Sequence, residues 1–257
     1  MSLFQESFKI LSDHQSVRLF NVILAASQIL GIFAIFLVAL WMAGFNGGFS
    51  AGLQFHYHPT FMVMGLIFLA GDGILAYRVF RHERKRFCKL LHLTLQTIVL
   101  IFVTVALKAV FDSHNNNKDD KGQPDPLPNM YSLHSWIGLT SVIAFFSQYL
   151  LGFVTFFYPG WNISMRQLIL PYHQAFGLLI LCFIGITAVM GISEQAAWHH
   201  KCWTVDHVLC NQQLISTLLG ICILMFVMCI VIIVLNPRWR RQPLPEEETL
   251  HHLTNID

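Results

Sequence analysis

The chain has 257 residues, of which 55% are hydrophobic and 12% are charged, and its formal net charge is +2 at pH 7. Soluble domains carry about 25% charged residues, so half that share excludes an ordinary soluble domain and indicates a polytopic membrane protein. A net charge this small gives no reason to expect a nucleic-acid partner, and in a membrane protein the placement of charge matters more than its sum.

Six apolar segments are long enough to cross a hydrocarbon core of about 30 Å, which takes about 20 helical residues. The predicted spans are 20–43, 57–80, 91–111, 132–157, 171–192 and 213–235. The sequence therefore predicts an all-α, six-span domain over 20–235, after an N-terminal segment 1–19. The tail 236–257 turns acidic and polar after its first residues, and we expect it to be disordered.

Basic residues predict the orientation of these spans. With six spans, most basic residues near the span ends fall on one face: Lys9, Arg18, Arg78, Arg81, Arg84, Lys85, Arg86, Lys89, Arg166, Arg238, Arg240 and Arg241. The opposite loops hold Lys118, Lys121 and Lys201 beside several aspartates. The first face, with both termini, is therefore predicted to be cytosolic.

Two short motifs bear on this orientation. The sequon Asn162-Ile163-Ser164 lies on a predicted cytosolic loop and should carry no sugar. Cys202 and Cys210 share one loop on the other face and could form a disulfide if that loop meets an oxidising compartment.

Four histidines open four successive predicted spans: His58, His92, His134 and His173. Because successive spans run in opposite directions, His58 and His134 fall near the non-cytosolic face, and His92 and His173 near the cytosolic face. Two imidazoles from facing helices can fill both axial sites of a haem, which then carries single electrons rather than binding oxygen. The pattern predicts two metal centres stacked across the membrane within spans 2–5.

Two other interpretations of the histidines stay open. A lone histidine at a span end is usually an interfacial anchor, and a haem-free, histidine-lined metal transporter is the main rival function. Such a transporter would need carboxylates along its path. The predicted spans hold almost none, and Asp72 is the clearest buried acid. His56 is a weaker ligand candidate than His58, because Pro59 places His58 in the first helical turn. The remaining histidines are expected to be solvated: His14, His82, His199, His200, His207, His251 and His252.

Several local motifs surround these histidines. They are His58-Pro59, Gly71-Asp72, Tyr77-Arg78, Lys85 and Lys89 ahead of His92, Phe111-Asp112-Ser113-His114, Asn129-Met130-Tyr131-Ser132-Leu133-His134-Ser135-Trp136, and Arg166 before His173. On these motifs the chain resembles the cytochrome b561 family over about two thirds of its length. The Gly-Asp and Tyr-Arg-Val-Phe-Arg motifs are most similar to those of the chromaffin-granule type. The wording around His134 also fits the duodenal ferric reductase.

The resemblance implies a homodimer in a lipid bilayer that binds two haem b groups. It implies electron transfer from cytosolic ascorbate to monodehydroascorbate, or to a ferric complex, on the other side. His58 with His134 would hold the non-cytosolic haem, and His92 with His173 the cytosolic haem. Arg78 matches a position near a haem propionate. A secretory-vesicle membrane is favoured, with endolysosomal and plasma membranes as alternatives.

The resemblance also implies two substrate sites. Lys85, Lys89 and Arg166 match the cytosolic ascorbate site, and Phe111, His114 and Tyr131 match the site on the other face. Lys85, Lys89 and His114 are the catalytic candidates. Lys85 and Lys89 lie four apart on one helical face, and their charge would attract the ascorbate monoanion.

Some polar residues have two interpretations. For Arg81, Arg84 and Arg86 we expect only a role in topology. Lys108 either extends to the non-cytosolic surface or pairs with a propionate or an anionic substrate. Glu194 either binds a metal or is solvated.

Overall fold

The computed structural model describes residues 11–50, 52 and 54–247, and all six predicted spans are helical in it. The elements are α2 (Asp13–Leu40), η1 (Trp41–Phe45), η2 (Gln54–His56), α3 (Tyr57–Phe61), η3 (Met62–Leu69), α4 (Ala70–Val79), α5 (Lys85–Asn115), α6 (Leu133–Phe156), α7 (Ile163–His199), α8 (Lys201–Thr204), α9 (Asn211–Leu235) and η4 (Pro237–Trp239). The second span is a continuous run of four elements from η2 to α4, and η3 is π-helical. The prediction of an all-α, six-span protein is confirmed.

Several helices extend beyond the predicted spans because polar caps add turns that hydropathy does not detect. The side chain of Asn162 accepts a hydrogen bond from the Met165 N–H (2.9 Å), so α7 begins eight residues before Pro171. Arg166, expected in a loop, therefore lies in the first turn of α7. Lys85 and Lys89, which lie outside the predicted span 91–111, belong to α5.

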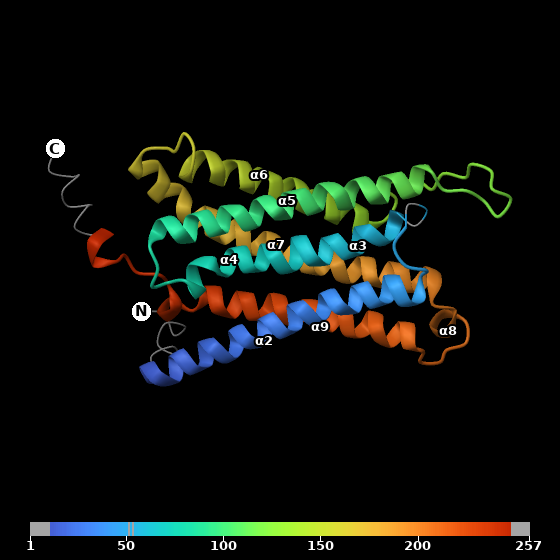
Figure 1. Cartoon of the computed structure of the whole chain (residues 1–257), viewed down its shortest axis with the longest axis horizontal. Coiled ribbons are helices and arrows are strands. Elements are labelled where there is room, and N and C mark those ends of the chain that lie inside the picture. The colour runs from blue at the N-terminus through green and yellow to red at the C-terminus, as the bar shows by residue number, and fades with distance from the viewer. Residues whose placement is uncertain (1–10, 51, 53, 248–257) are drawn as a thin grey trace.

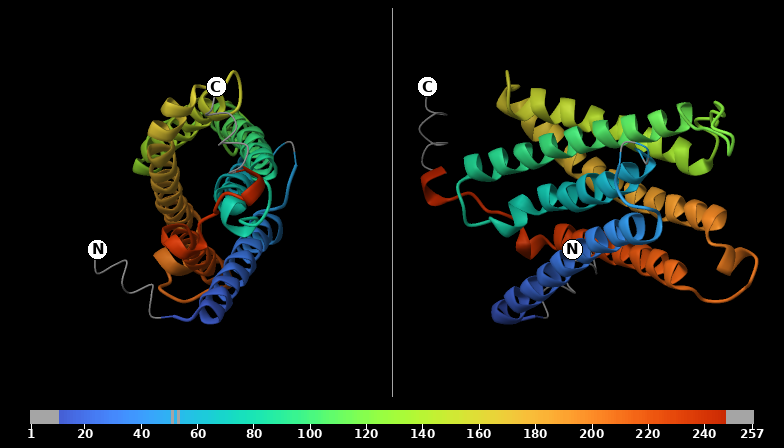
Figure 2. Two further views of the ribbon diagram at one scale, coloured as in Figure 1. Left: turned by 90° about the vertical axis from the view of Figure 1, so that its left-hand side faces the viewer. Right: turned by 45° about the vertical axis from the view of Figure 1, so that its right-hand side comes forward.

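The helices lie roughly along one axis, and α9 packs against both α2 and α7 (Figures 1 and 2). The interior side chains of α9, among them Ile223, Phe226 and Ile230, are fully buried. The Phe226 ring meets that of Phe68 on η3 at 5.9 Å. The first and last spans thus pack against each other beside the group made by spans 2–5, where all four candidate histidines lie.

Short connections at one end of the bundle, residues 80–84 and 157–162, lie close to the start of α2 and to the residues after α9. Arg238 forms an ion pair with Asp13 (2.6 Å), and the Trp239 indole donates to the Ser16 hydroxyl (3.1 Å). We call the end of the bundle that holds the connections 80–84 and 157–162 the basic end. The connections 116–132 and 200–210 lie at the opposite end.

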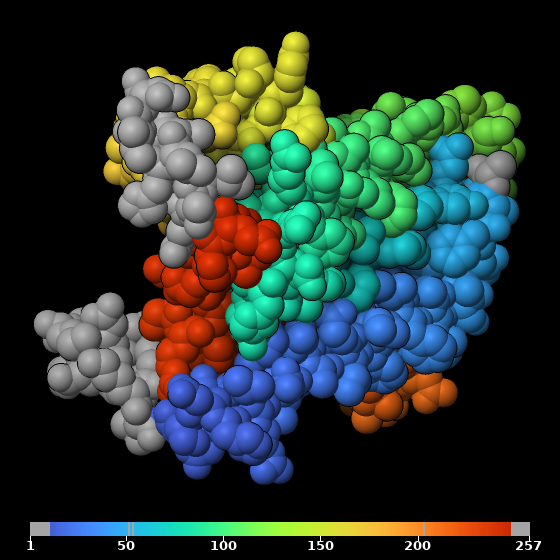
Figure 3. All heavy atoms as spheres, turned by 60° about the vertical axis from the view of Figure 1, so that its left-hand side comes forward, coloured from blue at the N-terminus to red at the C-terminus, as the bar shows by residue number. Residues whose placement is uncertain are grey.

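Two features left open by the sequence have an outcome here. Cys202 and Cys210 are joined by a disulfide at the opposite end. Of the tail predicted to be disordered, residues 248–257 lie outside the described residues. Residues 236–247 lie against the basic end, where the space-filling view shows them beside the start of α5 (Figure 3).

Candidate functional site

The four span-opening histidines form two facing pairs. His58 on α3 faces His134 on α6, with ring centroids 6.3 Å apart and planes inclined at 86°. His92 on α5 faces His173 on α7, with centroids 6.2 Å apart and planes inclined at 74°. A metal–nitrogen bond of about 2.0 Å, plus roughly 1.1 Å from that nitrogen to its ring centre, places two axial imidazole centres about 6.2 Å apart. The structure thus brings together the predicted partners at a spacing that fits one metal ion between each pair.

Backbone carbonyl groups orient three of these rings. The Nδ1 atoms of His58, His92 and His134 lie 3.2, 2.7 and 2.9 Å from the carbonyl oxygens of Ala106, Gly73 and Thr187. A ring that donates its Nδ1 proton to a carbonyl keeps the lone pair on Nε2, the atom that binds a metal.

His173 differs from the other three. Its Nδ1 is buried and has no hydrogen-bond partner among the described residues. Its backbone carbonyl accepts a hydrogen bond from the Gln148 amide (2.5 Å), and its ring packs edge-on against Phe156 at 5.4 Å. The ring orientation of His173 therefore depends on packing.

The two pairs lie at different depths in the bundle. Ala106, which receives the Nδ1 proton of His58, lies 14 residues after His92 on α5. Fourteen residues correspond to about 21 Å of helix. The pair His92/His173 therefore lies toward the basic end and the pair His58/His134 toward the opposite end.

Two glycines allow α6 and α7 to approach these rings closely. A Cβ added at Gly191 would lie 2.6 Å from Cε1 of His134, and one at Gly152 would lie 2.8 Å from Cε1 of His173. Each glycine lies 18 residues after the histidine of its own helix. Eighteen residues are five turns, so each glycine lies on the same face of its helix as that histidine. Our sequence analysis missed these glycines, although this equal interval on the two helices was visible in the sequence.

Three cations meet at the basic end. Lys89 lies close enough to Arg166 and Lys85 for charge repulsion, and its ammonium donates to the Phe156 carbonyl (3.0 Å). Arg166 is half-buried beside Gly160, and its Nε has no hydrogen-bond partner in the described structure. Because Lys89 precedes His92 by one helical turn, this group of cations borders the His92/His173 pair.

Arg78 is near the end of α4, and its guanidinium reaches the C-terminus of α9, where it donates to the carbonyl groups of Val234 (2.6 Å) and Asn236 (3.3 Å). A cation is favourable there because the last carbonyl groups of a helix carry partial negative charge. The contact with a haem propionate expected from the resemblance remains a prediction.

His114 at the opposite end lies within electrostatic range of His58, and its Nδ1 contacts the Asn129 side-chain oxygen (3.1 Å). Phe111 is partly exposed and Tyr131 is largely exposed, so both are open to a ligand. Lys108 forms an ion pair with Asp112 one turn later on α5. That pairing gives Lys108 a partner within its own helix.

Two histidines outside the pairs are buried. The Nδ1 of His56 contacts the Gly48 carbonyl oxygen (2.5 Å). His200 was predicted to be solvated, but only 1% of it is exposed. Its Nδ1 meets the Gln213 side chain (2.8 Å), and its ring packs beside Trp41. The prediction was wrong because His200 follows the last turn of α7 and folds back onto α9 and the end of the first span.

Asp72 has its partner on another span. Its carboxyl group accepts a hydrogen bond from the Gln28 amide of α2 (2.9 Å), which links the first span to the residue beside Gly73. Among residues 11–50, 52 and 54–247, no group of three or more His, Cys, Asp or Glu side chains forms a candidate ion site.

Comparison with known proteins gives the family of the chain. Residues 57–199 match the family model for eukaryotic cytochrome b561. A Caenorhabditis elegans protein named as a homologue of transmembrane ascorbate-dependent reductase CYB561 is 53% identical over 257 residues, covering 98% of this chain and 97% of the relative. Transmembrane ascorbate-dependent reductase CYB561 of Homo sapiens is 36% identical over 88% of this chain and 87% of its own. Plasma membrane ascorbate-dependent reductase CYBRD1 of Mus musculus is 31% identical over 90% of this chain and 78% of its own. This chain belongs to the eukaryotic cytochrome b561 family.

Proposed function

We propose that the protein is a di-haem transmembrane oxidoreductase, which takes single electrons from ascorbate at the basic end and delivers them to an acceptor at the opposite end. The observation that carries this proposal is the two facing imidazole pairs, each spaced for one iron, at two depths in the bundle. The relatives are named ascorbate-dependent reductases, which supports the choice of electron donor.

The residues around the pairs fit haem b, the cofactor that the family implies. His58 with His134 would hold one haem, and His92 with His173 the other. The carbonyl partners of three rings leave Nε2 free to ligate, and the missing side chains at Gly152 and Gly191 let the rings of His173 and His134 lie against the facing helix. A haem with an imidazole in both axial positions supplies a one-electron carrier without an open coordination site.

The basic end fits an anionic electron donor. Ascorbate is a monoanion near neutral pH, and the charges of Lys85, Lys89 and Arg166 would attract and orient it. The buried Arg166 Nε is a donor that a bound ascorbate oxygen would satisfy. Lys85 and Lys89 come from α5 and Arg166 from α7, so one ligand would contact both helices that carry the His92/His173 pair.

The opposite end fits a small oxidised acceptor, either monodehydroascorbate or a ferric complex. His114, near His58, would donate a hydrogen bond to the acceptor or transfer a proton to it. Phe111 and Tyr131 would lie beside the acceptor. The Cys202–Cys210 disulfide favours an oxidising compartment on this side. The basic end and both termini would then be cytosolic, and we propose a homodimer in a secretory-vesicle membrane.

Sealed proteoliposomes test this function directly. Vesicles with ascorbate trapped inside should reduce monodehydroascorbate or a ferric complex added outside, and protein-free vesicles should not. A redox titration of the purified protein should show two haems per chain by their reduced α-band. A colourless protein that moves metal ions would instead favour the haem-free transporter, and a haem protein without transmembrane reduction would refute the proposed electron transfer.

A further inference from the structure

The helix that carries Lys85, Lys89 and His92 begins without a favourable cap. Arg84 is the N-cap residue of α5, and its side chain makes no capping hydrogen bond in the described structure. Lys85 and Arg86 follow, so three cations lie where the helix dipole is positive, an arrangement that destabilises the first turn. The first N–H groups of α5 need acceptors from elsewhere.

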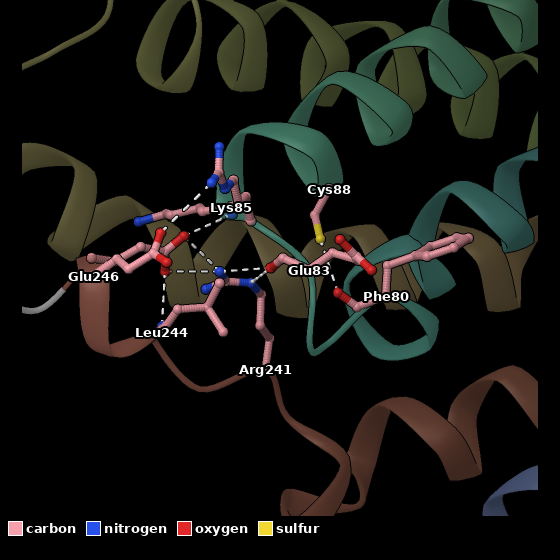
Figure 4. Close-up of polar contacts among 9 residues, drawn as sticks. Phe80, Glu83, Lys85, Cys88, Arg241, Leu244 and Glu246 are labelled. Carbon is pink, nitrogen blue, oxygen red and sulfur yellow. Dashed lines mark hydrogen bonds and ion pairs between the residues drawn. The ribbon is translucent and has the colours of Figure 1, made fainter.

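The C-terminal segment provides such an acceptor (Figure 4). One carboxylate oxygen of Glu247 accepts the Lys85 N–H (2.8 Å), and the other accepts the Leu244 N–H (3.1 Å). Arg241 donates to both of these oxygens (2.7 and 2.8 Å) and to the Glu83 carbonyl (2.9 and 3.0 Å). The Arg241 side chain is 9% exposed and that of Glu247 is 25% exposed, so this ion pair is more shielded from solvent than an ordinary surface contact.

This contact borders the proposed ascorbate site. Lys85 is the first residue of α5, and Lys89 lies one turn further along. Arg241 also lies within electrostatic range of Tyr77 and Cys88, and the Tyr77 ring is 5.9 Å from that of His92. The tail therefore contacts the first turn of the helix that presents two of the three cations.

We propose that Glu247, held by Arg241, is a positioning residue for ascorbate. It caps the first turn of α5 from a distant part of the chain and thereby holds Lys85, one of the three cations, in place. This inference rests on the proposed function. Fraying of a helix is confined to its first turn, and His92 lies seven residues inside α5, so loss of the cap should weaken ascorbate binding and leave the haem in place.

The competing interpretation predicts the opposite sign. If the carboxylate of Glu247 blocked the anion site, its removal would free the Lys85 N–H for ascorbate and lower the KM. The effect of the substitution on the KM therefore separates a positioning residue from an inhibitory one.

The experiment measures steady-state reduction of the full-length haem protein by ascorbate. Glu247→Ala should raise the ascorbate KM about fivefold, the equivalent of about 1 kcal/mol that is typical of a lost helix cap. The kcat and the haem absorption should be unchanged. Glu246→Ala is the matched control, because the neighbouring Glu246 is 75% exposed and, within the described part of the chain, its ion pair is a 3.8 Å contact with the exposed Arg84.

A second-site change tests the mechanism. Arg84→Ser places a hydroxyl at the N-cap position, where it can accept from the Arg86 or Phe87 N–H and stabilise the same first turn through a different donor. Glu247→Ala combined with Arg84→Ser should restore the KM, after comparison with Arg84→Ser alone, even though one cation has been lost.

Several results would overturn the proposal: an unchanged or lowered KM in Glu247→Ala, loss of haem in that variant, or no recovery in the double variant. A wild-type protein that ascorbate fails to reduce would instead refute the proposed function.

Discussion

The close approach of α7 to His134 gives a sharp prediction for Gly191→Ala. The added Cβ would lie 2.6 Å from Cε1 of His134, where ordinary contact begins at 3.4 Å. The ring must therefore move by roughly 0.8 Å, several times the tolerance of about 0.2 Å on a metal–ligand bond. It would also be pushed relative to the Thr187 carbonyl that orients it. We expect this variant to lose the haem of the His58/His134 pair and to keep the other.

The assay is a redox titration of the reduced α-band with a haem-to-protein ratio, which should fall from two to about one. Gly152→Ala is the mirror experiment, because its Cβ would meet His173 at 2.8 Å, and it should remove the haem of the other pair. Gly220→Ala is the control, since a Cβ there has no neighbour within 4 Å and alanine favours a helix. Two haems with unchanged potentials in Gly191→Ala would refute the assigned position of His134.

Replacing His92 or His173 with a non-ligating residue should remove the haem nearer the basic end and retain the other; two haems in either variant would mean that the pairing is wrong. Arg166→Ala should raise the barrier for reduction by ascorbate by about 1–3 kcal/mol without haem loss, and an unchanged dependence on ascorbate concentration would contradict its assigned role. Burial raises the pKa of Glu247, but hydrogen bonds from Arg241 and from the Lys85 and Leu244 N–H groups outweigh this and lower it from 4.5 to about 2. The contact is then fully stabilising above pH 4.5 and weakens as the pH falls toward 2. Hydrogen exchange at the Lys85 amide, corrected for its intrinsic rate, should stay constant from pH 5 to 8, and deprotection within that range would count against the contact.

The sequence was sufficient to predict the spans and the histidine pairs, because both follow from long-range regularities. Six apolar segments require alternating directions, and alternation alone places His58 with His134 and His92 with His173. The depth of each histidine follows from the rise per residue of a helix. The facing rings at 6.2 and 6.3 Å agree with that placement.

The ends of the helices were harder to predict, because their partners are distant in the chain. Hydropathy placed Arg166 and Lys85 in loops, whereas an Asn162 cap and the Glu247 contact continue α7 and α5 around them. Glu247 lies 162 residues after Lys85, and nothing in the local sequence of either segment indicates that they meet. Composition alone made the tail look unstructured, since acidic and polar residues give no sign of a buried arginine partner.

An interval of 14 or 15 residues separates three of the histidines from the carbonyl group that the same span offers to a neighbouring span. His92 and Ala106 lie 14 residues apart on α5, and His58 and Gly73 lie 15 apart on the second span. The Nδ1 contacts between these two spans are reciprocal, from His58 to Ala106 and from His92 to Gly73. The extra residue falls within the π-helical η3, whose wider turns absorb it. The π-helix therefore keeps His58 and Gly73 on the surface that faces α5.

On α7, His173 and Thr187 are also 14 residues apart, and Thr187 receives the Nδ1 proton of His134. The corresponding position on α6, 14 residues after His134, is Gln148. Its side chain donates to the His173 backbone carbonyl, and the reciprocal contact from the His173 Nδ1 is missing in the described structure. His173 is thus positioned by packing against Phe156 and Gly152 where its three counterparts have a carbonyl group. For this reason the space beside Gly152 is more decisive for His173 than the space beside Gly191 is for His134.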